Sequence, residues 1–358
     1  MKYILLFIAL IPFFGFTQNV IPFIDFSNYF RSFQNRNFRI LQMQPVSEFK
    51  TGDDMVAYMD NRGNLMVYDG TRTTDIANSS VEYTLSDHLL VWKIGYTLNI
   101  WDNNKLKTLT YNGGQYAVKD SMVIFEDNRY NAVKIYENGE IKTVYQAIGN
   151  LQMPIAVGDN IMAYRDNGDF YRIYYKGETF DIDVWQGNIN FSCGTDVLAF
   201  NDPTTRTFAA FENGGLIDVE DIFVNKYRAG RGFIVYEDNI GNLIRFQNGV
   251  KTKLTDFGAS FWEVKDDIVV WGENSFLYMA NKEKKWKVCN YIPETYKVKN
   301  KTLAFQNAMN GVSVSQDGKM EVITTLMDSQ YEIFGNSVLV TLFNRSFLVY
   351  SNGEIFEQ

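Results

Sequence analysis

Hydrophobic positions recur along most of the chain in short runs of consecutive apolar residues. The stretch MVAYMDNRGNLMVYDG (55–70) returns as IMAYRDNGDFYRIYYKG (161–177) and as FIVYEDNIGNLIRFQNG (233–249). An aromatic residue in the first half of each copy serves as an anchor and defines nine copies. The anchors are Tyr58, Trp92, Phe125, Tyr164, Phe200, Tyr236, Trp271 and Phe305, with Val340 in the ninth copy. Their spacing stays between 33 and 39 residues, which indicates a repeat protein.

The columns around the anchor predict the strands of each copy. Both positions before the anchor are apolar in all nine copies, which predicts a short strand buried on both faces. An aromatic column nine residues before it and an apolar one seven before it predict a preceding strand. Tight turns such as GDD (52–54) join the two. A turn such as DNRGN (60–64), a third strand and a more polar fourth strand follow. We name the four expected strands A to D in chain order.

Many copies of a four-stranded unit buried on both faces are typical of a β-propeller. An open β-solenoid is the alternative, but such arrays need a polar outer face on their terminal repeats. The ninth copy still carries the apolar run Val338, Leu339 and Val340. The sequence therefore predicts an all-β fold, a single closed β-propeller of four-stranded antiparallel blades. We expect nine blades, one per repeat, with eight as the alternative.

The amino terminus has the pattern of a targeting segment. Residues 1–17 combine Lys2, an apolar run, and the small residues Gly15 and Thr17 before a cleavage point, which is typical of a secretory signal peptide. A short membrane anchor is the alternative. We expect an exported protein, either periplasmic or extracellular, with no transmembrane segment after cleavage.

The remaining boundaries follow from the repeat. Residues 18–43 would form an N-terminal extension over one face or edge of the ring, and residues 44–358 the propeller. Within the extension, FRILQM (38–43) would add an outer strand to the last blade and lock the ring. The carboxy-terminal GEIFEQ (353–358) would supply a short strand at the same place.

A recurring "aromatic–x–Asp–x–x–Gly–Asn" pattern links two inner strands. It is formed by Tyr58, Asp60, Gly63 and Asn64, and again by Tyr236, Asp238, Gly241 and Asn242. In this pattern the chain resembles the secreted, WD40-like propeller repeats of the TolB type. The Gly-His and terminal Trp-Asp signatures of true WD40 blades are missing, apart from an isolated Trp101-Asp102. The resemblance implies a propeller that scaffolds protein contacts or binds ligands, although some relatives are glycan enzymes or peptidases.

The most regular polar feature lies two residues after the anchor. Six of the nine copies carry an acid there: Asp60, Asp127, Asp166, Asp202, Asp238 and Glu273. One interpretation is a ring of carboxylates that binds a cation or a basic partner. The other is that each acid starts a turn by accepting hydrogen bonds from backbone N–H groups. No copy shows the spaced acids of a calcium loop, so we predict no metal and no cofactor.

Aromatic residues also fall outside the repeat columns. Tyr111, Tyr145, Trp185, Phe257 and Tyr291 lie in the connections between strand D of one copy and strand A of the next. They are candidates for stacking on sugars or packing on a partner protein. Inter-blade packing is the alternative interpretation.

Candidate catalytic residues are few. His88 is the single histidine and lies in a turn, Cys193 falls in an apolar strand column, and Cys289 lies two repeats further on. No GxSxG motif occurs, so we predict no catalytic residue and no disulfide between the two cysteines. A pair of carboxylates remains the alternative for glycoside chemistry.

Composition and charge exclude further classes of function. The formal charge of −8 has the wrong sign for a nucleic-acid-binding protein. A chain that is 46% hydrophobic and 16% aromatic is not intrinsically disordered. We predict a monomeric, non-enzymatic extracytoplasmic binding or scaffold propeller that presents a loop face to an envelope or extracellular protein, or to a glycan. The alternative is a carbohydrate-active enzyme, a glycoside hydrolase or lyase, that uses paired carboxylates in the central channel.

Overall fold

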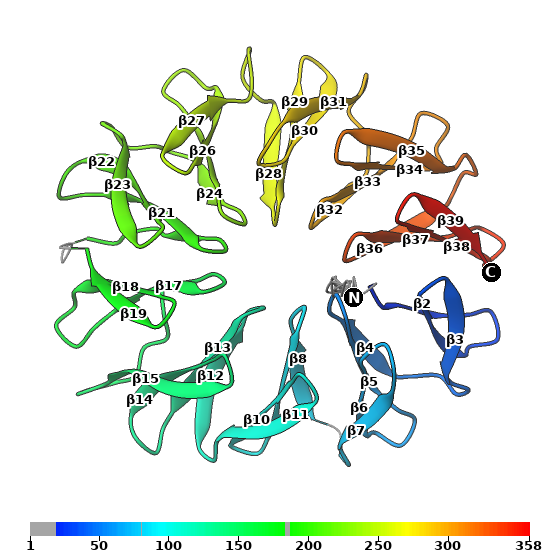
Figure 1. Cartoon of the computed structure of the whole chain (residues 1–358), viewed down its shortest axis with the longest axis horizontal. Helices are drawn as coiled ribbons and strands as arrows, with labels where there is room; N and C mark the ends of the chain where they lie inside the picture. The colour runs from blue at the N-terminus through cyan, green and yellow to red at the C-terminus, as the bar shows by residue number, and fades with distance from the viewer. Residues whose placement is uncertain (1–18, 80, 183–186) are drawn as a thin grey trace, which may run out of the picture.

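The computed structural model describes residues 19–358 except for residues 80 and 183–186. The predicted signal peptide, residues 1–17, lies outside the described residues. The described chain folds into ten antiparallel sheets arranged around a common centre, as Figure 1 shows. We number these blades one to ten in chain order.

Nine of the ten sheets have the four strands that the repeat predicts, in the order A–B–C–D. The innermost strands, A, are β4 (Glu48–Thr51), β8 (Glu82–Leu85), β12 (Gly113–Val118), β16 (Ala156–Val157), β20 (Ser192–Cys193), β24 (Tyr227–Ala229), β28 (Phe261–Lys265), β32 (Tyr296–Lys299) and β36 (Gln330–Phe334). The B strands are β5 (Val56–Met59), β9 (Leu89–Ile94), β13 (Met122–Asp127), β17 (Ile161–Arg165), β21 (Val197–Asp202), β25 (Ile234–Glu237), β29 (Ile268–Glu273), β33 (Thr302–Gln306) and β37 (Ser337–Thr341).

The outer half of each of these blades consists of a C and a D strand. The C strands are β6 (Leu65–Tyr68), β10 (Thr97–Asp102), β14 (Ala132–Glu137), β18 (Tyr171–Tyr175), β22 (Thr207–Glu212), β26 (Leu243–Gln247), β30 (Phe276–Ala280), β34 (Val312–Gln316) and β38 (Phe347–Ser351). The D strands are β7 (Thr73–Ala77), β11 (Lys105–Thr110), β15 (Glu140–Gln146), β19 (Glu178–Asp181), β23 (Gly215–Glu220), β27 (Val250–Lys253), β31 (Lys285–Cys289), β35 (Lys319–Thr324) and β39 (Glu354–Glu357).

The first blade corrects the predicted blade number. Strands β1 (Ile21–Ile24), β2 (Phe30–Gln34) and β3 (Asn37–Gln42) form a separate three-stranded sheet in the described part of the chain. The expectation of nine blades, or eight, is therefore wrong: the chain has ten. The first blade keeps the repeat signature: Phe23 lies 35 residues before the anchor Tyr58, and Asp25 lies two residues after Phe23.

The predicted ring-closing strand is also wrong. Residues 38–43 were expected to join the last blade, but β3 pairs with β2 of its own sheet. The carboxy-terminal strand β39 does complete the last blade, through pairing with β38. Each blade is thus built from consecutive strands, and no strand is shared between the first and the last blade in the described part of the chain.

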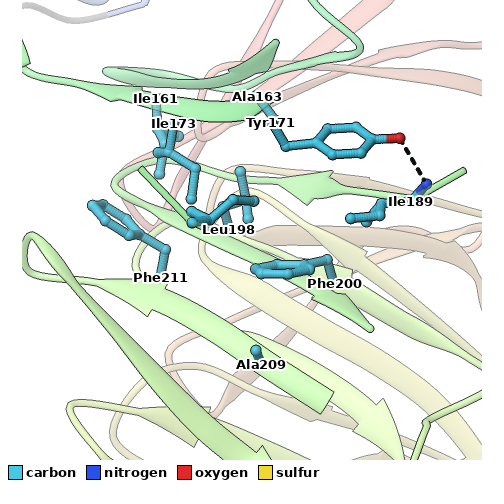
Figure 2. Close-up of a cluster of buried hydrophobic side chains, with 10 residues drawn as sticks. Ile161, Ala163, Tyr171, Ile173, Ile189, Leu198, Phe200, Ala209 and Phe211 are labelled. Carbon is cyan, nitrogen blue, oxygen red and sulfur yellow. Dashed lines mark hydrogen bonds between the residues drawn. The ribbon is translucent and has the colours of Figure 1, made fainter. Parts of the chain in front are cut away.

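Apolar clusters fill the seams between neighbouring blades. Figure 2 shows the seam between blades five and six, where Ile173 packs with Leu198 and Phe200 and the Tyr171 hydroxyl accepts a hydrogen bond from the Ile189 N–H (3.3 Å). The B strands contribute to both seams beside them, which explains why they are apolar on both faces. Burial of a large apolar side chain contributes about 1.5–3 kcal/mol, so each seam is a substantial source of stability.

A cluster of the same kind joins the two ends of the ring. Ile21, Phe23 and Phe33 of the first blade pack against Phe334, Leu339, Phe347 and Val349 of the last. The rings of Phe33 and Phe356 lie 5.0 Å apart between their centroids. Figure 1 shows β2 and β3 beside β36–β39 at this point. The first and last blades therefore meet through packed side chains.

A belt of hydrogen bonds follows the A–B turns around the centre. At least one bond crosses every seam: Val20 N to Asp53 O (3.2 Å), Asp53 N to Asp87 O (3.2 Å), Asp87 N to Asp120 Oδ1 (2.9 Å), Asp120 N to Asp159 Oδ1 (2.7 Å), Asp159 N to Gly194 O (3.0 Å), Thr195 N to Gly230 O (3.1 Å), Arg231 N to Asp266 O (2.6 Å), Asn300 N to Asp266 Oδ2 (2.9 Å), Lys301 N to Asn336 Oδ1 (3.3 Å) and Asn19 Nδ2 to Phe334 O (3.1 Å). The A–B turns of blades two to ten consequently lie at one end of the ring.

The strand order then divides the turns between two faces. Because successive strands are antiparallel, the A–B and C–D turns lie at one end, which we call the polar face. The B–C turns and the D–A connections lie at the other end, which we call the connector face.

Candidate functional site

The six predicted acids lie at the ends of the B strands or in the B–C turns, on the connector face. In the second blade, Asp60 Oδ1 accepts hydrogen bonds from the N–H groups of Arg62 and Asn64, both at 2.8 Å. Asp238 accepts the equivalent bonds from Ile240 (3.0 Å) and Asn242 (2.8 Å). These are the contacts expected of an acid that starts a turn.

Three of the remaining acids have the same role, including Asp127, which accepts from the Arg129 N–H (3.2 Å), and Glu273 differs. Asp166 accepts from the N–H of Gly168 (2.8 Å), and Asp202 from that of Thr204 (2.7 Å). Asp127 is buried and pairs with the Lys134 ammonium at 2.7 Å. Glu273 Oε1 accepts from the N–H groups of Asp256 (2.7 Å) and Phe257 (2.9 Å), and so holds the neighbouring D–A connection.

The pKa values of three of these carboxyl groups reflect their turn contacts. Burial acts to raise the pKa of each carboxyl group, but hydrogen bonds outweigh burial and lower the pKa overall. The donors are backbone N–H groups together with one side chain for each acid: Asn64 for Asp60, Arg172 for Asp166 and Asn242 for Asp238. The carboxylates are therefore ionised and already hydrogen-bonded within their own turns. Five of the six acids accept hydrogen bonds within their own turns, as the turn interpretation predicts, whereas Glu273 holds a D–A connection; a role in binding a ligand stays a prediction.

The predicted aromatic residues divide into exposed and packed side chains. Tyr111 is 73% exposed and Phe257 is 80% exposed. Tyr145 is half-buried and stacks on Tyr164, with ring centroids 5.7 Å apart. Tyr291 is also half-buried, and its hydroxyl donates to the Gln306 carbonyl (3.3 Å). Trp185 lies outside the described residues.

Exposed apolar side chains gather on the connector face beyond the predicted ones. Among the described residues, the large exposed apolar side chains lie in B–C turns or D–A connections, at strand ends next to them, or on D strands; none lies in an A–B or C–D turn. The most exposed members on the connector face are Ile148, Phe257, Ile240, Phe26, Tyr111, Tyr96, Met43, Phe343, Met309 and Met327. They come from blades around the whole ring and do not converge on one pocket.

The opposite end of the channel is crossed by charged side chains. Lys299 of the ninth blade lies 3.0 Å from Asp53 Oδ1 of the second and 3.3 Å from Asp87 Oδ1 of the third. Asn300 Nδ2 donates to Asp53 Oδ2 at 2.8 Å. Arg231 of the seventh blade pairs with Asp267 of the eighth at 2.8 Å. The Lys299 and Asn300 contacts join turns of blades that are not neighbours along the ring, whereas the Arg231–Asp267 pair joins neighbouring blades.

A central cavity of about 650 Å³ lies beside this network. Its lining includes Asp87, Asp120 and Asp159 from one side of the ring, and Lys297 and Lys299 from the other. Burial, together with the carboxylates of Asp120 and Asp53, raises the pKa of Asp87 to about 7, against the opposing effect of Lys299. Asp87 thus titrates near neutral pH within a hydrogen-bonded network.

Substitution Asp87→Asn should stabilise the fold at pH 8 by about 1 kcal/mol or more, because one pKa unit corresponds to about 1.4 kcal/mol. The folded protein holds the Asp87 proton more tightly than the unfolded chain does, so wild-type stability should fall as pH rises from about 4 to 7. Asparagine mimics the protonated acid and removes this dependence. Urea unfolding between pH 4 and 8 measures it, and an Asp87→Asn variant that is less stable than wild type at pH 8 would contradict the assignment.

His88 and the two cysteines lie apart from one another. The His88 side chain is 55% exposed, as predicted for a turn residue, and its Nδ1 lies 3.1 Å from Asp54 Oδ2. Cys193 and Cys289 are both free and lie on blades six and eight. Burial raises the pKa of both thiols, so they are not activated nucleophiles.

Sequence reasoning missed the A–B turn network. Asp53, Asp87 and Asp120 stand in turns that were interpreted only as hairpin connections, and Lys299 ends strand β32 beside such a turn. Their acid-rich composition was visible, in GDD (52–54) and KDD (265–267) for example. The contact between Lys299 and Asp87 was not, because it joins residues 212 positions apart across the channel.

In residues 19–358, outside the gaps, no helix has the length and apolarity needed to cross a membrane. Over the same residues, no group of three or more His, Cys, Asp or Glu side chains is arranged to hold a metal ion.

Comparisons with solved structures return matches at low identity. The computationally designed Ika8 protein shares 13% identity, with 85% of this chain and 99% of that one covered and a TM-score of 0.35. BamB from Moraxella catarrhalis shares 13%, with 75% and 96% covered and a TM-score of 0.33. Hsv2p from Kluyveromyces lactis shares 12%, with 69% and 97% covered and a TM-score of 0.32.

A search of curated protein sequences found no match. The model of the "10-bladed beta propeller domain" family matches residues 15–356, which is nearly the whole chain. The match agrees with the ten sheets and with the inclusion of the three-stranded first blade. The chain therefore belongs to the ten-bladed β-propeller domain family.

Proposed function

We propose that this chain is a non-enzymatic binding propeller that docks a protein partner on its connector face, outside the cytoplasm. The observation that carries the proposal is the gathering of exposed apolar side chains on that face. Large exposed apolar surfaces on soluble proteins mark interaction sites. Among the described residues, no large exposed apolar side chain lies in an A–B or C–D turn, and those nearest the polar face, such as Leu106 and Val250, lie on D strands.

The types of exposed side chain favour a protein over a glycan. Ile148 is 88% exposed, Ile240 78% and Met309 63%, and none of these can stack on a sugar ring as an aromatic side chain does. Aromatic and methionine side chains are enriched in protein interfaces, and methionine adapts to irregular surfaces. A surface of mixed aliphatic, methionine and aromatic residues suits the irregular surface of a protein partner.

The enzyme alternative rests on the central cavity, where Asp87 has a pKa near neutral. A carboxyl group poised in this way is a feature of acid–base catalysis. Here its neighbours are engaged elsewhere: Asp53 accepts from Asn300 Nδ2, Asp120 from the Asp87 N–H, and Asp159 from the Asp120 N–H. The acids therefore join blades to one another, which supports binding as the better proposal.

The test uses two residues of the seventh blade that lie on neighbouring turns. The B–C turn with Ile240 and the D–A connection with Phe257 approach each other, since a Cβ on Gly258 would lie 3.0 Å from the Gly241 oxygen. The double variant Ile240→Asp, Phe257→Asp should weaken partner binding at least tenfold, because centrally placed apolar residues dominate interface energies. Quantitative capture of envelope proteins by the immobilised chain measures the loss.

The matched control is Val250→Asp, on the D strand of the same blade, where Val250 is 60% exposed. It adds the same charge to an exposed apolar position away from the connector face, and the captured protein should be retained. Equal loss by the control and the double variant would overturn the assignment of the binding face. Export, which is part of the proposal, predicts that the secreted protein has the mass of a chain lacking residues 1–17.

A further inference from the structure

The two ends of the ring meet at a blade that differs from the others on its channel side. Strand β1 corresponds to the B strand of the other blades, because Asp25 Oδ1 accepts from the N–H groups of Ser27 (2.8 Å) and Tyr29 (2.9 Å), as Asp60 does in blade two. In the described part of the chain, β1 is therefore the innermost strand of blade one, whereas an A strand lines the channel in the other nine blades.

The belt of hydrogen bonds is also longest around this blade. At the four seams from blade nine through ten, one and two to blade three, the belt bonds measure 3.3, 3.1, 3.2 and 3.2 Å. The belt bonds at the other six seams measure 2.6–3.1 Å. Between blades ten and one, the belt bond comes from a side chain, that of Asn19. We call blades nine, ten, one, two and three the closing sector.

Side chains of blade nine span the closing sector directly. Lys299 Nζ lies 3.0 Å from Asp53 Oδ1 in blade two and 3.3 Å from Asp87 Oδ1 in blade three. Asn300 Nδ2 donates to Asp53 Oδ2 at 2.8 Å. Both carboxylate oxygens of Asp53 are thus contacted from blade nine, past the two blades that lie between them along the ring.

These contacts are partly shielded from water. The side chains of Lys299 and Asp53 are 23% and 21% exposed. Burial acts to lower the pKa of Lys299, but the carboxylates of Asp53 and Asp87 raise it overall, so the ammonium stays charged. Asn300 is buried, and its own N–H donates to Asp266 Oδ2 (2.9 Å), which fixes its position. Loss of one partner from such a shielded pair costs more than loss from an exposed one, because the other charge is left without compensation.

We propose that Lys299, Asn300 and Asp53 form a latch that holds the ring closed across its terminal blades. The latch joins blades nine and two directly, so blades ten and one cannot separate while it is intact. Once it is released, blades ten and one are held together by their apolar seam, the Asn19 bond and the exposed pair of Arg36 and Glu354 (2.7 Å). The ring then opens locally at this point, while the other blades stay packed.

The test is hydrogen–deuterium exchange of the full chain, measured by mass spectrometry. Lys299→Met keeps the apolar stem of the side chain but removes its charge. In this variant the backbone amides of β1, β2, β37 and β38 should exchange at least tenfold faster than in wild type. Amides of blades five and six should keep the wild-type rate, because the opening is local. Lys299→Arg keeps the charge and should restore slow exchange.

Asp53→Asn tests the other end of the latch. It should accelerate exchange in the same strands to a smaller extent, because an amide oxygen can still accept the bond from Asn300. This milder variant also carries the test if Lys299→Met does not fold. Since both substitutions break one contact, the double variant should exchange no more than about twofold faster than Lys299→Met.

Lys176→Met is the matched control. Lys176 of blade five pairs with Asp196 of blade six at 2.9 Å on the polar face, so this substitution removes an ion pair between neighbouring blades. Exchange in blades one and ten should stay at the wild-type rate. The proposal would be overturned by unchanged exchange of blades one and ten in Lys299→Met and Asp53→Asn. Equal acceleration in all ten blades, or the same acceleration of blades one and ten in Lys176→Met, would also overturn it.

Discussion

Replacing Phe33 with alanine should lower the free energy of unfolding by about 3–5 kcal/mol, the usual cost of removing a buried phenylalanine. Phe33 is 2% exposed and lies in the seam between the first and last blades, against Phe38 and Phe356. The two ends of the chain share no strand among the described residues, so this seam depends on side-chain packing. Urea unfolding followed by tryptophan fluorescence measures the change.

Phe26→Ala is the matched control in the same blade. Phe26 is 73% exposed, and its removal should change the unfolding free energy by no more than about 0.5 kcal/mol. If Phe33→Ala were as mild as the control, the first and last blades would not be packed against each other, and the description of the ring as continuous would fail.

Replacing Gly194 with alanine should destabilise the ring by about 2–3 kcal/mol, as overpacking of a close contact does. A Cβ on Gly194 would lie 1.9 Å from the carbonyl oxygen of Gly230, in the A–B turn of the next blade. The opposing atom belongs to the backbone, and the adjacent bond from Thr195 N to Gly230 O (3.1 Å) holds the turns together. The neighbouring turn therefore cannot move away without breaking the belt of hydrogen bonds.

Gly149→Ala controls for the general effect of adding a methyl group. A Cβ at Gly149 meets no atom within 4 Å, and its φ is not in the left-handed region. This variant should be neutral or slightly stabilising, because alanine restricts the unfolded chain. Thermal unfolding of both variants decides the matter: a Gly194→Ala protein that melts at the wild-type temperature would show that the A–B turns do not meet.

The repeat architecture could be predicted because its sequence signals lie within each copy. The doubly apolar B strand and the turn acids depend only on neighbours within each copy, and copies such as Val56–Met59 and Ile234–Glu237 appear as strands in the structure. The first blade was missed although Phe23 and Asp25 match the repeat. Pro22 stands at the position directly before Phe23, which is apolar in the other copies, and residues 1–17 were assigned to a signal peptide.

The site was less predictable than the fold. The turn role of Asp60 and Asp238 follows from local hydrogen bonds and could be inferred from the sequence. The exposure of Ile148 and Ile240 depends on which end of the ring each turn occupies, and the Lys299–Asp87 contact depends on how the A–B turns converge. Both require the three-dimensional arrangement of blades that are far apart in the sequence.

Photo-crosslinking from single positions tests the central claim, that the connector face docks a protein, most directly. A photoreactive amino acid would replace Tyr111, Ile240 or Phe257 on the connector face, and Lys105 or Asn138 on the polar face. We expect the three connector-face positions to crosslink the same envelope protein and the two polar-face positions to leave it uncaptured. Capture of that protein from the polar face, with none from the connector face, would contradict the claim.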